Sequence, residues 1–439
     1  MSLISKKEYA RRRKHVMEMM GKGSIAIIPT SPIRIRNRDV EYSFRPDSDF
    51  YYLTGFAEPD AVAVLIPGRK HAEYILFCNE RDPEMEIWNG PRAGQDGAVS
   101  DFQADDSFPI TDIDDILPGL LENNDRVYYN MGCHPDFDQR VIGWINSIRN
   151  KSRSGVHTPG EVISLENILH EMRLFKSAAE IRVMRKAAKI SVKGHQRAMQ
   201  LCKPNMMEYQ IEAELLSTFM HHGSRSPAYS SIVGGGANGC VLHYVMNNEK
   251  LFDGELLLID AGAELDHYAS DITRTFPVNG KFSPAQRAIY DVVLAAQQAA
   301  IEQVKPGNHW NDPHEAAVKE IVRGLIDVGI LKGTLRTNLK NEAYKRFYMH
   351  RTGHWLGMDV HDVGEYKVGD EWRVLEPGMV MTVEPGIYIP EKSKGIAKKW
   401  WNIGIRIEDD VLVTRDGYDV LTRDLVSDAD DIEALMAAK

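Results

Sequence analysis

The chain has 439 residues, more than one ordinary core needs, so its length predicts two domains. Its 53 basic and 63 acidic side chains give a net charge of -10, which argues against a nucleic-acid-binding protein with its basic field. No apolar run approaches the roughly 20 residues that span a bilayer, and no apolar signal segment begins the chain, so we expect a cytoplasmic protein without membrane association.

The first 175 residues mix short apolar segments with helical ones, which is typical of an α/β domain. SIAIIPT (residues 24–30) and RVYYN (residues 126–130) have the composition of strands. Residues 61–78 predict a β-hairpin that turns at Pro67-Gly68. This part of the sequence contains no cluster of metal ligands and no nucleophile with a base beside it. It therefore offers no candidate site of its own.

The remaining residues, 176–439, repeat one order of elements, in which two helices precede a group of strands. Ser283 and Asp312 each stand before a proline, the pattern of an N-cap followed by the first helical position. We therefore expect a duplicated α+β unit with a site in the cleft between its halves. The expected helices and strand groups span residues 179–202, 208–223, 229–276, 283–307, 312 onward and 347–421.

The segment LLLIDAGAELDHYASDITRTF, residues 256–276, carries one aspartate in each of two apolar, strand-like arms. A turn centred between Leu265 and Asp266 would place Asp260 opposite Asp271, with their Cβ atoms about 5 Å apart. Two full charges at that distance repel by roughly 3 kcal/mol at an effective dielectric constant of about 20. This cost predicts a shared proton or a bound cation. The alternative is that Asp260 caps a turn and Asp271 faces water.

The segment MHRTGHWLGMDVHDVG contains His350, His354 and His361. A single histidine is more often structural than a ligand, but three so close together, among glycines that let the backbone approach, favour a functional site. His350 and His354 have the spacing of a helical metal pair. However, Gly353 lies between them and the glutamate of HExxH is absent, which argues against a thermolysin-like zinc site.

Two further strand-like segments carry acidic residues. VMTVE ends in Glu384, whereas Glu376 stands before that strand and is expected in a surface turn. In NIGIRIEDD, alternation places Arg406 and Glu408 on one face. Arg406 is therefore placed to orient a nearby carboxylate by charge-assisted hydrogen bonds.

Four carboxylates and one imidazole suit hard or borderline divalent ions, above all Mn²⁺, with Co²⁺, Zn²⁺ or Fe²⁺ as alternatives. Two such ions would neutralise four carboxylates. Two-metal sites hold their ions about 3.5–4 Å apart and activate a water molecule for hydrolysis. The residues alone therefore favour a metal-dependent hydrolase.

The segments DAGAELDHYASDITRTF, GHWLGMDVHDVG, TVEPGIYI and GIRIEDD resemble, in this order, the metal-site motifs of the pita-bread metallopeptidases. Residues 37–65 are similar to the N-terminal domain of the aminopeptidase P and prolidase branch, and SIVGGGANGCVLHY looks like the segment before its first metal strand. The resemblance covers nearly the whole chain. It implies an aminopeptidase P-type α/β domain at residues 1–175 and an α+β pita-bread catalytic domain at residues 176–439.

The resemblance also implies a metal ligand set. Asp260 would chelate one Mn²⁺ ion, and Asp271 would bridge both ions. His354 and Glu384 would bind the second ion, and Glu408 would bridge. All five ligand types are present, so we expect an active enzyme with two ions per chain.

Further roles follow from the same resemblance. Glu384 would act as the general base, and His361 would hydrogen-bond the substrate carbonyl or the tetrahedral intermediate. Arg406 would support the metal-binding carboxylates. The expected catalytic residues are Glu384, His361 and His354, and the expected substrate-binding residues are His243, His350, His361 and Arg406.

The implied activity is the release of an N-terminal residue that precedes proline. Prolidase, which requires a free carboxylate after proline, is the alternative because it has the same five ligands. A non-catalytic binding protein on the same fold is an alternative of a different class. The family also implies a homodimer or homotetramer, in which Trp88 would either shape a neighbour's pocket or pack inside its own domain.

Overall fold

The structure is a computed structural model that describes residues 3–438. It divides into two compact units, Met1–Met172 and Arg173–Lys439, and the division falls inside helix α7 (Glu166–Leu174). The sequence placed the boundary at residues 175/176, just after this helix. Within the described residues, no helix is both long and apolar enough to cross a membrane.

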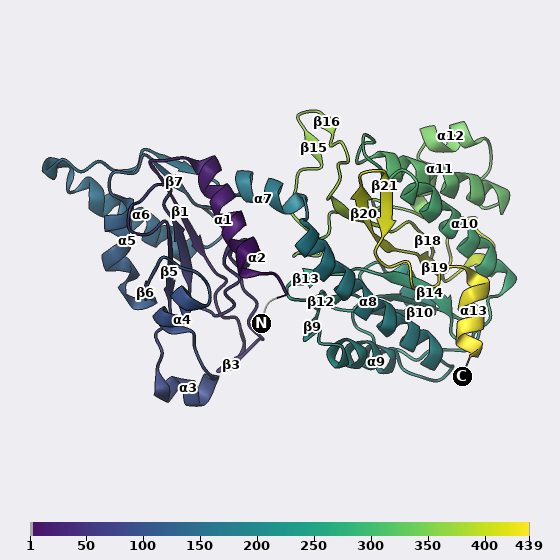
Figure 1. The fold of residues 1–439 in the computed structure, drawn as a ribbon. Coiled ribbons are helices and arrows are strands. Elements are labelled where there is room, and N and C mark those ends of the chain that lie inside the picture. Colours follow the sequence, from purple (N-terminus) through teal and green to yellow (C-terminus); the bar gives the residue numbers. More distant parts are fainter. Residues whose placement is uncertain (1–2, 439) are drawn as a thin grey trace. The chain divides into compact units, whose positions relative to one another are not determined.

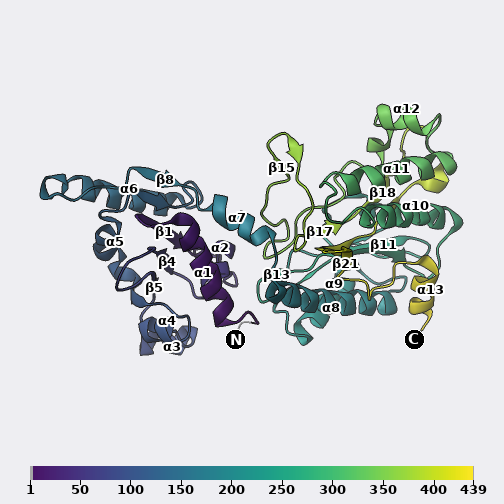
Figure 2. The same cartoon turned by 45° about the horizontal axis from the view of Figure 1, so that its top comes forward.

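The first unit is built around one six-stranded sheet with the order β6-β5-β4-β1-β7-β8. The sheet is mixed, because β1 pairs antiparallel with β4 and parallel with β7. Figure 1 labels β1, β5, β6 and β7 of this sheet, and Figure 2 labels β4 and β8. Its helices are α1 (Lys6–Met20), α2 (Ser48–Thr54), α3 (Pro83–Asn89), α4 (Gly94–Ser100), α5 (Ile113–Leu121) and α6 (Pro135–Arg149). Its strands are β1 (Ser24–Pro29), β2 (Ile35–Asn37), β3 (Val40–Glu41), β4 (Val62–Leu65), β5 (Tyr74–Cys78), β6 (Asp106–Pro109), β7 (Arg126–Tyr128) and β8 (Glu161–Ile163).

The predicted hairpin at residues 61–78 is confirmed, because β4 and β5 pair antiparallel. Apolar side chains of β1, β4 and β5 form a buried core with those of α5 and α6. Trp88 lies outside this core on α3 and is 83% exposed. The alternative that Trp88 packs inside its own domain is therefore wrong.

The second unit confirms the predicted repeat of two helices followed by strands. In Figures 1 and 2 its strands lie between the α8 and α9 pair on one side and the α10 and α11 pair on the other. Its helices are α8 (Ala178–Leu201), α9 (Glu208–His221), α10 (Pro284–Ile301), α11 (Asp312–Asp327), α12 (Leu335–Lys340) and α13 (Ala429–Ala437). The strands of its first half are β9 (Ser226–Pro227), β10 (Ile232–Gly235), β11 (Leu256–Asp260), β12 (Ala263–Leu265), β13 (Tyr268–Ala269) and β14 (Thr273–Pro277). Those of its second half are β15 (Lys367–Val368), β16 (Glu371–Trp372), β17 (Val380–Val383), β18 (Gly386–Ile389), β19 (Ile403–Arg406), β20 (Asp409–Thr414) and β21 (Gly417–Val420).

Local signals explain where two of these helices begin. Ser177 caps α8 and forms a capping box with Glu180. Ser283 caps α10 in the same way with Gln286, and Pro284 takes the first helical position, as predicted. These caps satisfy backbone N–H groups that would otherwise lack partners at the helix start.

The register of the first metal-site hairpin differs from the expected one. Asp260 pairs with Thr273 instead of Asp271. The turn is centred on Asp266 and His267, which both have positive φ, one residue later than assumed. Moving the turn by one residue shifts the partner by two, and a shift of two keeps every side chain on its face. The two aspartates therefore remain on the same side despite the changed register.

Candidate metal centre

All five predicted metal ligands line one cavity of about 670 Å³ in the second unit. The four carboxylates stand at or beyond strand ends, where the backbone leaves the sheet. Asp260 ends β11, Asp271 lies between β13 and β14, Glu384 directly follows β17, and Glu408 lies between β19 and β20. His354 comes from the irregular segment before β17. The two halves of the repeat thus supply one common site.

Asp260 and Asp271 meet at a single tyrosine hydroxyl. The Tyr229 hydroxyl lies 2.5 Å from an oxygen of each carboxylate. A hydroxyl has one hydrogen and can donate to only one of them at a time. Asp260 is 9% exposed and Asp271 is 4% exposed, so the alternative that Asp271 faces water is wrong. The hydroxyl is neutral, so a positively charged group is needed to offset the repulsion between the two carboxylates.

His354 is oriented so that one ring nitrogen faces the acidic residues. Its Nδ1 lies 2.9 Å from the Trp355 carbonyl, which can only accept, so Nδ1 carries a hydrogen. Its Nε2 lies 3.4 Å from Asp271 and 3.7 Å from Glu384. Burial opposes a charged ring, but these two carboxylates outweigh burial and raise the pKa of His354 to about 9. A cation at Nε2 would take the place of that proton.

The four carboxyl groups are buried together, and their pKa values differ with their partners. Burial raises the pKa of Glu384 to about 7, and burial with repulsion from Asp271 raises the pKa of Glu408 far above its usual range. Burial also raises the pKa of Asp260 despite the nearby Arg406. Burial acts in the same direction on Asp271, but the hydrogen bond and charge of His354, together with Tyr229 and Arg406, outweigh it and lower the pKa. Such a cluster is costly unless cations offset its charge.

The donor set fits a divalent cation. One ligand atom each from Asp271, His354 and Glu408 lies within 4.8 Å of the others. Ligands bound about 2.1 Å from one ion lie up to about 4.2 Å apart, so small side-chain movements suffice. Carboxylate oxygens with one imidazole suit Mn²⁺-like ions, and the hydrogen-bonded Nδ1 of His354 is the usual arrangement for a metal-bound histidine. Asp260 and Glu384 adjoin this trio through Tyr229 and His354.

Arg406 bonds a carboxylate of the site, and the partner is Asp260 instead of its neighbour Glu408. Its Nη2 donates to Asp260 at 2.6 Å. Its Nη1 donates to Tyr388 at 3.0 Å, and its Nε donates to Thr273 at 3.1 Å. Because each guanidinium nitrogen is bonded to protein, Arg406 is fixed in place and in turn fixes Asp260.

Three histidines line the same cavity in different states. His361 and His243 are exposed to it, and His361 packs edge-on against His354 with ring centroids 4.3 Å apart. His350 has both ring nitrogens engaged, at 2.7 Å to the Arg351 carbonyl and at 2.9 Å to the Tyr388 hydroxyl. Burial lowers the pKa of His350 to about 4, so the ring is neutral at physiological pH. His350 therefore contributes a fixed wall, whereas His361 can turn toward a ligand.

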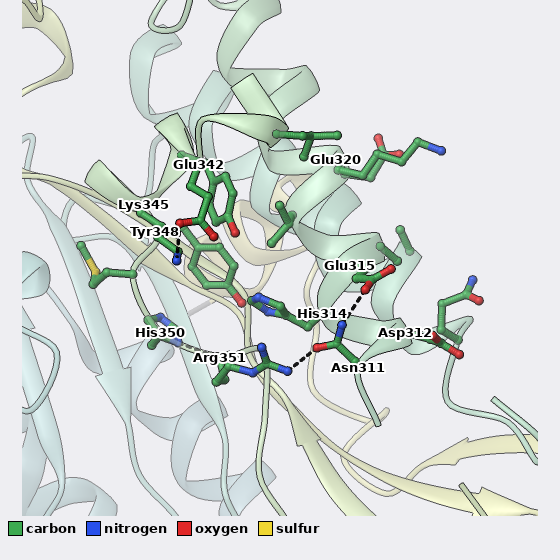
Figure 3. A pocket seen from close by; sticks show the side chains of 18 of the residues that line it. Asn311, Asp312, His314, Glu315, Glu320, Glu342, Lys345, Tyr348, His350 and Arg351 are labelled. Carbon is green, nitrogen blue, oxygen red and sulfur yellow. Dashed lines mark hydrogen bonds and ion pairs between the residues drawn. The ribbon is translucent and has the colours of Figure 1, made fainter. Parts of the chain in front are cut away.

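A further cavity of about 1030 Å³ shares His350 and Arg351 with the metal cavity. Figure 3 shows Arg351 reaching toward Asn311, which in turn donates to Glu315 at 2.6 Å. None of the five predicted ligands lines this cavity. Of its charged side chains, Lys345 pairs with Glu342 at 2.7 Å, and Arg351 contacts the neutral Asn311.

Hydroxyl groups that the sequence analysis did not single out support the carboxylates. Thr273 donates to Glu408 at 2.5 Å, and Thr382 donates to Glu384 at 3.3 Å. Strand alternation could have found Thr382, because it stands two positions before Glu384 and so shares its face. Tyr229 has no such signal, because it belongs to a separate, distant segment.

Comparison with known proteins assigns the family. The profile of metallopeptidase family M24 matches residues 182–415, and the profile of the aminopeptidase P N-terminal domain matches residues 9–128. The chain belongs to metallopeptidase family M24. The first profile spans the cavity and all five acidic and histidine residues proposed as ligands.

Individual M24 relatives match along the whole chain. The chain is 45% identical to Xaa-Pro aminopeptidase of Escherichia coli (strain K12), covering 100% of this chain and 99% of the relative. It is similar to the structure of Pseudomonas aeruginosa aminopeptidase PepP, with 60% identity, a TM-score of 0.99 and coverage of 100% and 99%. Proline aminopeptidase P II from Yersinia pestis matches with 47% identity, a TM-score of 0.96 and coverage of 99% and 100%. The predicted family and the two-domain pita-bread fold are confirmed.

Proposed function

We propose that this M24 metallopeptidase is an Xaa-Pro aminopeptidase, which hydrolyses the bond between an N-terminal residue and a following proline. The observation that carries this proposal is the meeting of four carboxylates and one imidazole in one cavity. The full-length likeness to a relative named Xaa-Pro aminopeptidase supports the substrate class.

We propose that Asp260, Asp271, His354, Glu384 and Glu408 hold two divalent ions, with Mn²⁺ as the preferred ion. Four carboxylates and the Arg406 guanidinium leave an excess of negative charge that two divalent ions would offset. Bound ions would supply positive charge that polarises the scissile carbonyl and activates the attacking water.

The chain's own side chains would then bind and orient the substrate. A carboxylate oxygen of Glu384 accepts a proton from the attacking water, and a ring nitrogen of His361 donates to the substrate carbonyl oxygen. His350 and His243 form the walls beside the substrate. Arg406 holds Asp260 in place instead of reaching for substrate. The leaving proline nitrogen must gain a proton as the bond breaks, and the proton that Glu384 takes from the attacking water can supply it.

A peptide panel tests the proposed activity. Mn²⁺-loaded protein is incubated with Xaa-Pro, Xaa-Pro-Yaa and Xaa-Ala-Yaa peptides, and the released amino acids are measured. We expect cleavage of Xaa-Pro-Yaa with little cleavage of Xaa-Ala-Yaa. Cleavage of the Xaa-Pro dipeptide alone would indicate prolidase. A protein that cleaves none of them when loaded would instead support the non-catalytic binding protein.

Elemental analysis tests the metal proposal separately from activity. We expect up to two ions per wild-type chain after dialysis against Mn²⁺. Glu408→Ala should lose bound metal, because Glu408 is one of the three closest ligands. Lys345→Met is the control, since this exposed lysine pairs with Glu342 and lies outside the ligand set. Equal metal content in Glu408→Ala and wild type would contradict the ligand assignment.

We also propose a cytoplasmic homodimer or homotetramer. The exposed Ile87 and Trp88 on α3, at 82% and 83%, are apolar side chains that a subunit contact would cover. Light scattering of the full chain measures the assembly. A wild-type monomer at micromolar concentration would contradict this proposal.

A further inference from the structure

A buried cluster of charges lies in the segment that carries His361. The Arg173 guanidinium contacts Asp359 at 2.7 Å and Asp362 at 2.6 Å, and Lys176 contacts the other oxygen of Asp362 at 2.9 Å. The side chains of Asp362 and Lys176 are each 1% exposed, and that of Arg173 is 3% exposed. Asp362 directly follows His361, so the cluster holds the chain right beside the histidine.

The loop is shaped around the Asp362 carboxylate. The Asp362 N–H donates to the Trp355 carbonyl at 2.9 Å, and the Gly357 N–H donates to the Asp359 carbonyl at 3.1 Å. A Cβ atom on Gly357 would lie 2.0 Å from the Asp362 carboxylate and 2.9 Å from Lys176. Only glycine leaves room for the carboxylate there. The loop thus folds back on itself, and its backbone has little freedom.

The same loop is bonded to strands on both sides of the metal cavity. The Ala269 N–H donates to the Gly357 carbonyl at 2.8 Å, two residues before Asp271. The Leu356 N–H donates to the Val380 carbonyl at 3.0 Å, on the strand that leads to Glu384. Displacing the loop would therefore alter the position of His361 relative to both metal-bearing strands.

The His361 ring itself has no hydrogen bond to any described protein group and only an edge-on contact with His354. Its position therefore depends on its backbone. Buried ion pairs are often no more stabilising than apolar side chains of similar size, so stability alone does not explain this cluster. The cluster is explained if it fixes one conformation of the His361 backbone.

We propose that Asp362, held by Arg173 and Lys176, is a positioning residue for His361, an inference that rests on the proposed function. Asp362 does not line the metal cavity, so it would act only through its neighbour. Loss of its charge would release the loop and misplace the His361 ring. A misplacement of about 1 Å can cost on the order of 100-fold in rate.

A double-mutant cycle tests this inference on the Mn²⁺-loaded full chain. Asp362→Asn is made in the wild type and in His361→Ala, and kcat and KM for an Xaa-Pro-Yaa peptide are measured. We expect Asp362→Asn to lower kcat by about 10- to 100-fold in the wild type with little change in KM. In the His361→Ala background we expect a further loss of no more than about twofold. Equal losses in both backgrounds would show a merely structural role and overturn the proposal.

Two further variants and a crystal structure keep the inference testable. Lys176→Met weakens the cluster without changing the loop sequence and should show the same pattern if Asp362→Asn fails to fold. Lys345→Met, which removes an exposed ion pair, should stay within about twofold of wild type. Crystals of Asp362→Asn show the His361 ring directly. An unmoved ring overturns the positioning role, whereas a wild type that cleaves no peptide overturns only the proposed function.

Discussion

His361 and His243 line the same cavity, but the segments that carry them are anchored differently. The His361 segment is held by charges of both signs, since Asp362 contacts Arg173 and Lys176. The His243 segment is held by the fully buried carboxylate of Glu208, which accepts hydrogen bonds from neutral groups alone. The donors to Glu208 are the N–H of Gly235 at 2.8 Å, Asn238 Nδ2 at 3.0 Å, the Tyr244 hydroxyl at 2.8 Å and the N–H of Glu249 at 2.9 Å.

The two anchors differ in what a single substitution leaves behind. In the ionic anchor, formed by Asp362, Arg173 and Lys176, removing one partner leaves an uncompensated charge in the protein interior. In the neutral anchor, formed by Glu208 and its four donors, four dipoles share the stabilisation of one charge, so losing one donor leaves three. We therefore expect the His361 anchor to be more sensitive to single substitutions than the His243 anchor.

The largest effect should come from Asp362→Asn. This change leaves Lys176 buried without its carboxylate partner and removes one charged partner of Arg173. We expect the free energy of unfolding to fall by about 3–5 kcal/mol, as measured by urea unfolding. A smaller loss of unfolding free energy than for Glu208→Gln would contradict the greater sensitivity of the His361 anchor.

Glu208→Gln is the matched substitution in the other anchor. The amide retains one acceptor oxygen but places an NH₂ group against donors that can no longer be satisfied. We expect a loss of about 1–3 kcal/mol in the same urea experiment. We also expect KM for an Xaa-Pro-Yaa peptide to change more than kcat, because His243 is proposed to line the substrate pocket. A kcat-only effect would indicate that the His243 segment serves another role.

Glycine substitutions compare how tightly the two anchors are enclosed. A Cβ atom at Gly357 would lie 2.0 Å from the Asp362 carboxylate, whereas one at Gly235 would lie 3.5 Å from Glu208 and 2.6 Å from the end of Leu251. Leu251 can move, but the bonded carboxylate cannot. Gly357→Ala should therefore cost about 1–3 kcal/mol or more in the free energy of unfolding, and Gly235→Ala less. The reverse order would show that the His361 loop is the looser one.

Acid should weaken the ionic anchor selectively. Burial raises the pKa of Asp362, but Lys176 and Arg173 outweigh burial and lower it below its usual value. A carboxyl with a lowered folded pKa stabilises above its unfolded pKa of about 3.9 and loses that contribution as the pH falls through the folded value. The difference in the free energy of unfolding between wild type and Asp362→Asn should thus be largest near neutral pH and should decrease below about pH 4. A difference that stays constant down to pH 3 would contradict the pairing.

The smallest effect should come from Tyr244→Phe, which removes one of the four donors to Glu208. Three donors remain, and the phenyl ring keeps its packing. We expect a loss of about 0.5–1.5 kcal/mol in the free energy of unfolding. A loss as large as that of Glu208→Gln would mean that the donors do not share the stabilisation.

Many residues of the metal centre could be predicted from short segments of the sequence. Alternation along strands placed Arg406 on the face of Glu408, and the same rule could have placed Thr382 beside Glu384, because a strand repeats its face every two residues. Serine followed by proline marked the start of α10 at Ser283. The turn at Asp266 and His267 was misplaced by one residue, because several positions there have the composition of a turn.

The order of motifs, and with it the family and the duplicated architecture, was determined by the sequence itself. Caps, turns and two-residue periodicity depend on neighbours within a few positions, so they can be predicted from the sequence. Only the tertiary structure decided which distant groups meet. Arg406 and Asp260 are 146 positions apart, and Lys176 and Asp362 are 186 apart. No local pattern links such pairs, because the packing of whole strands and helices brings them together. Burial then increases the energetic contribution of each contact.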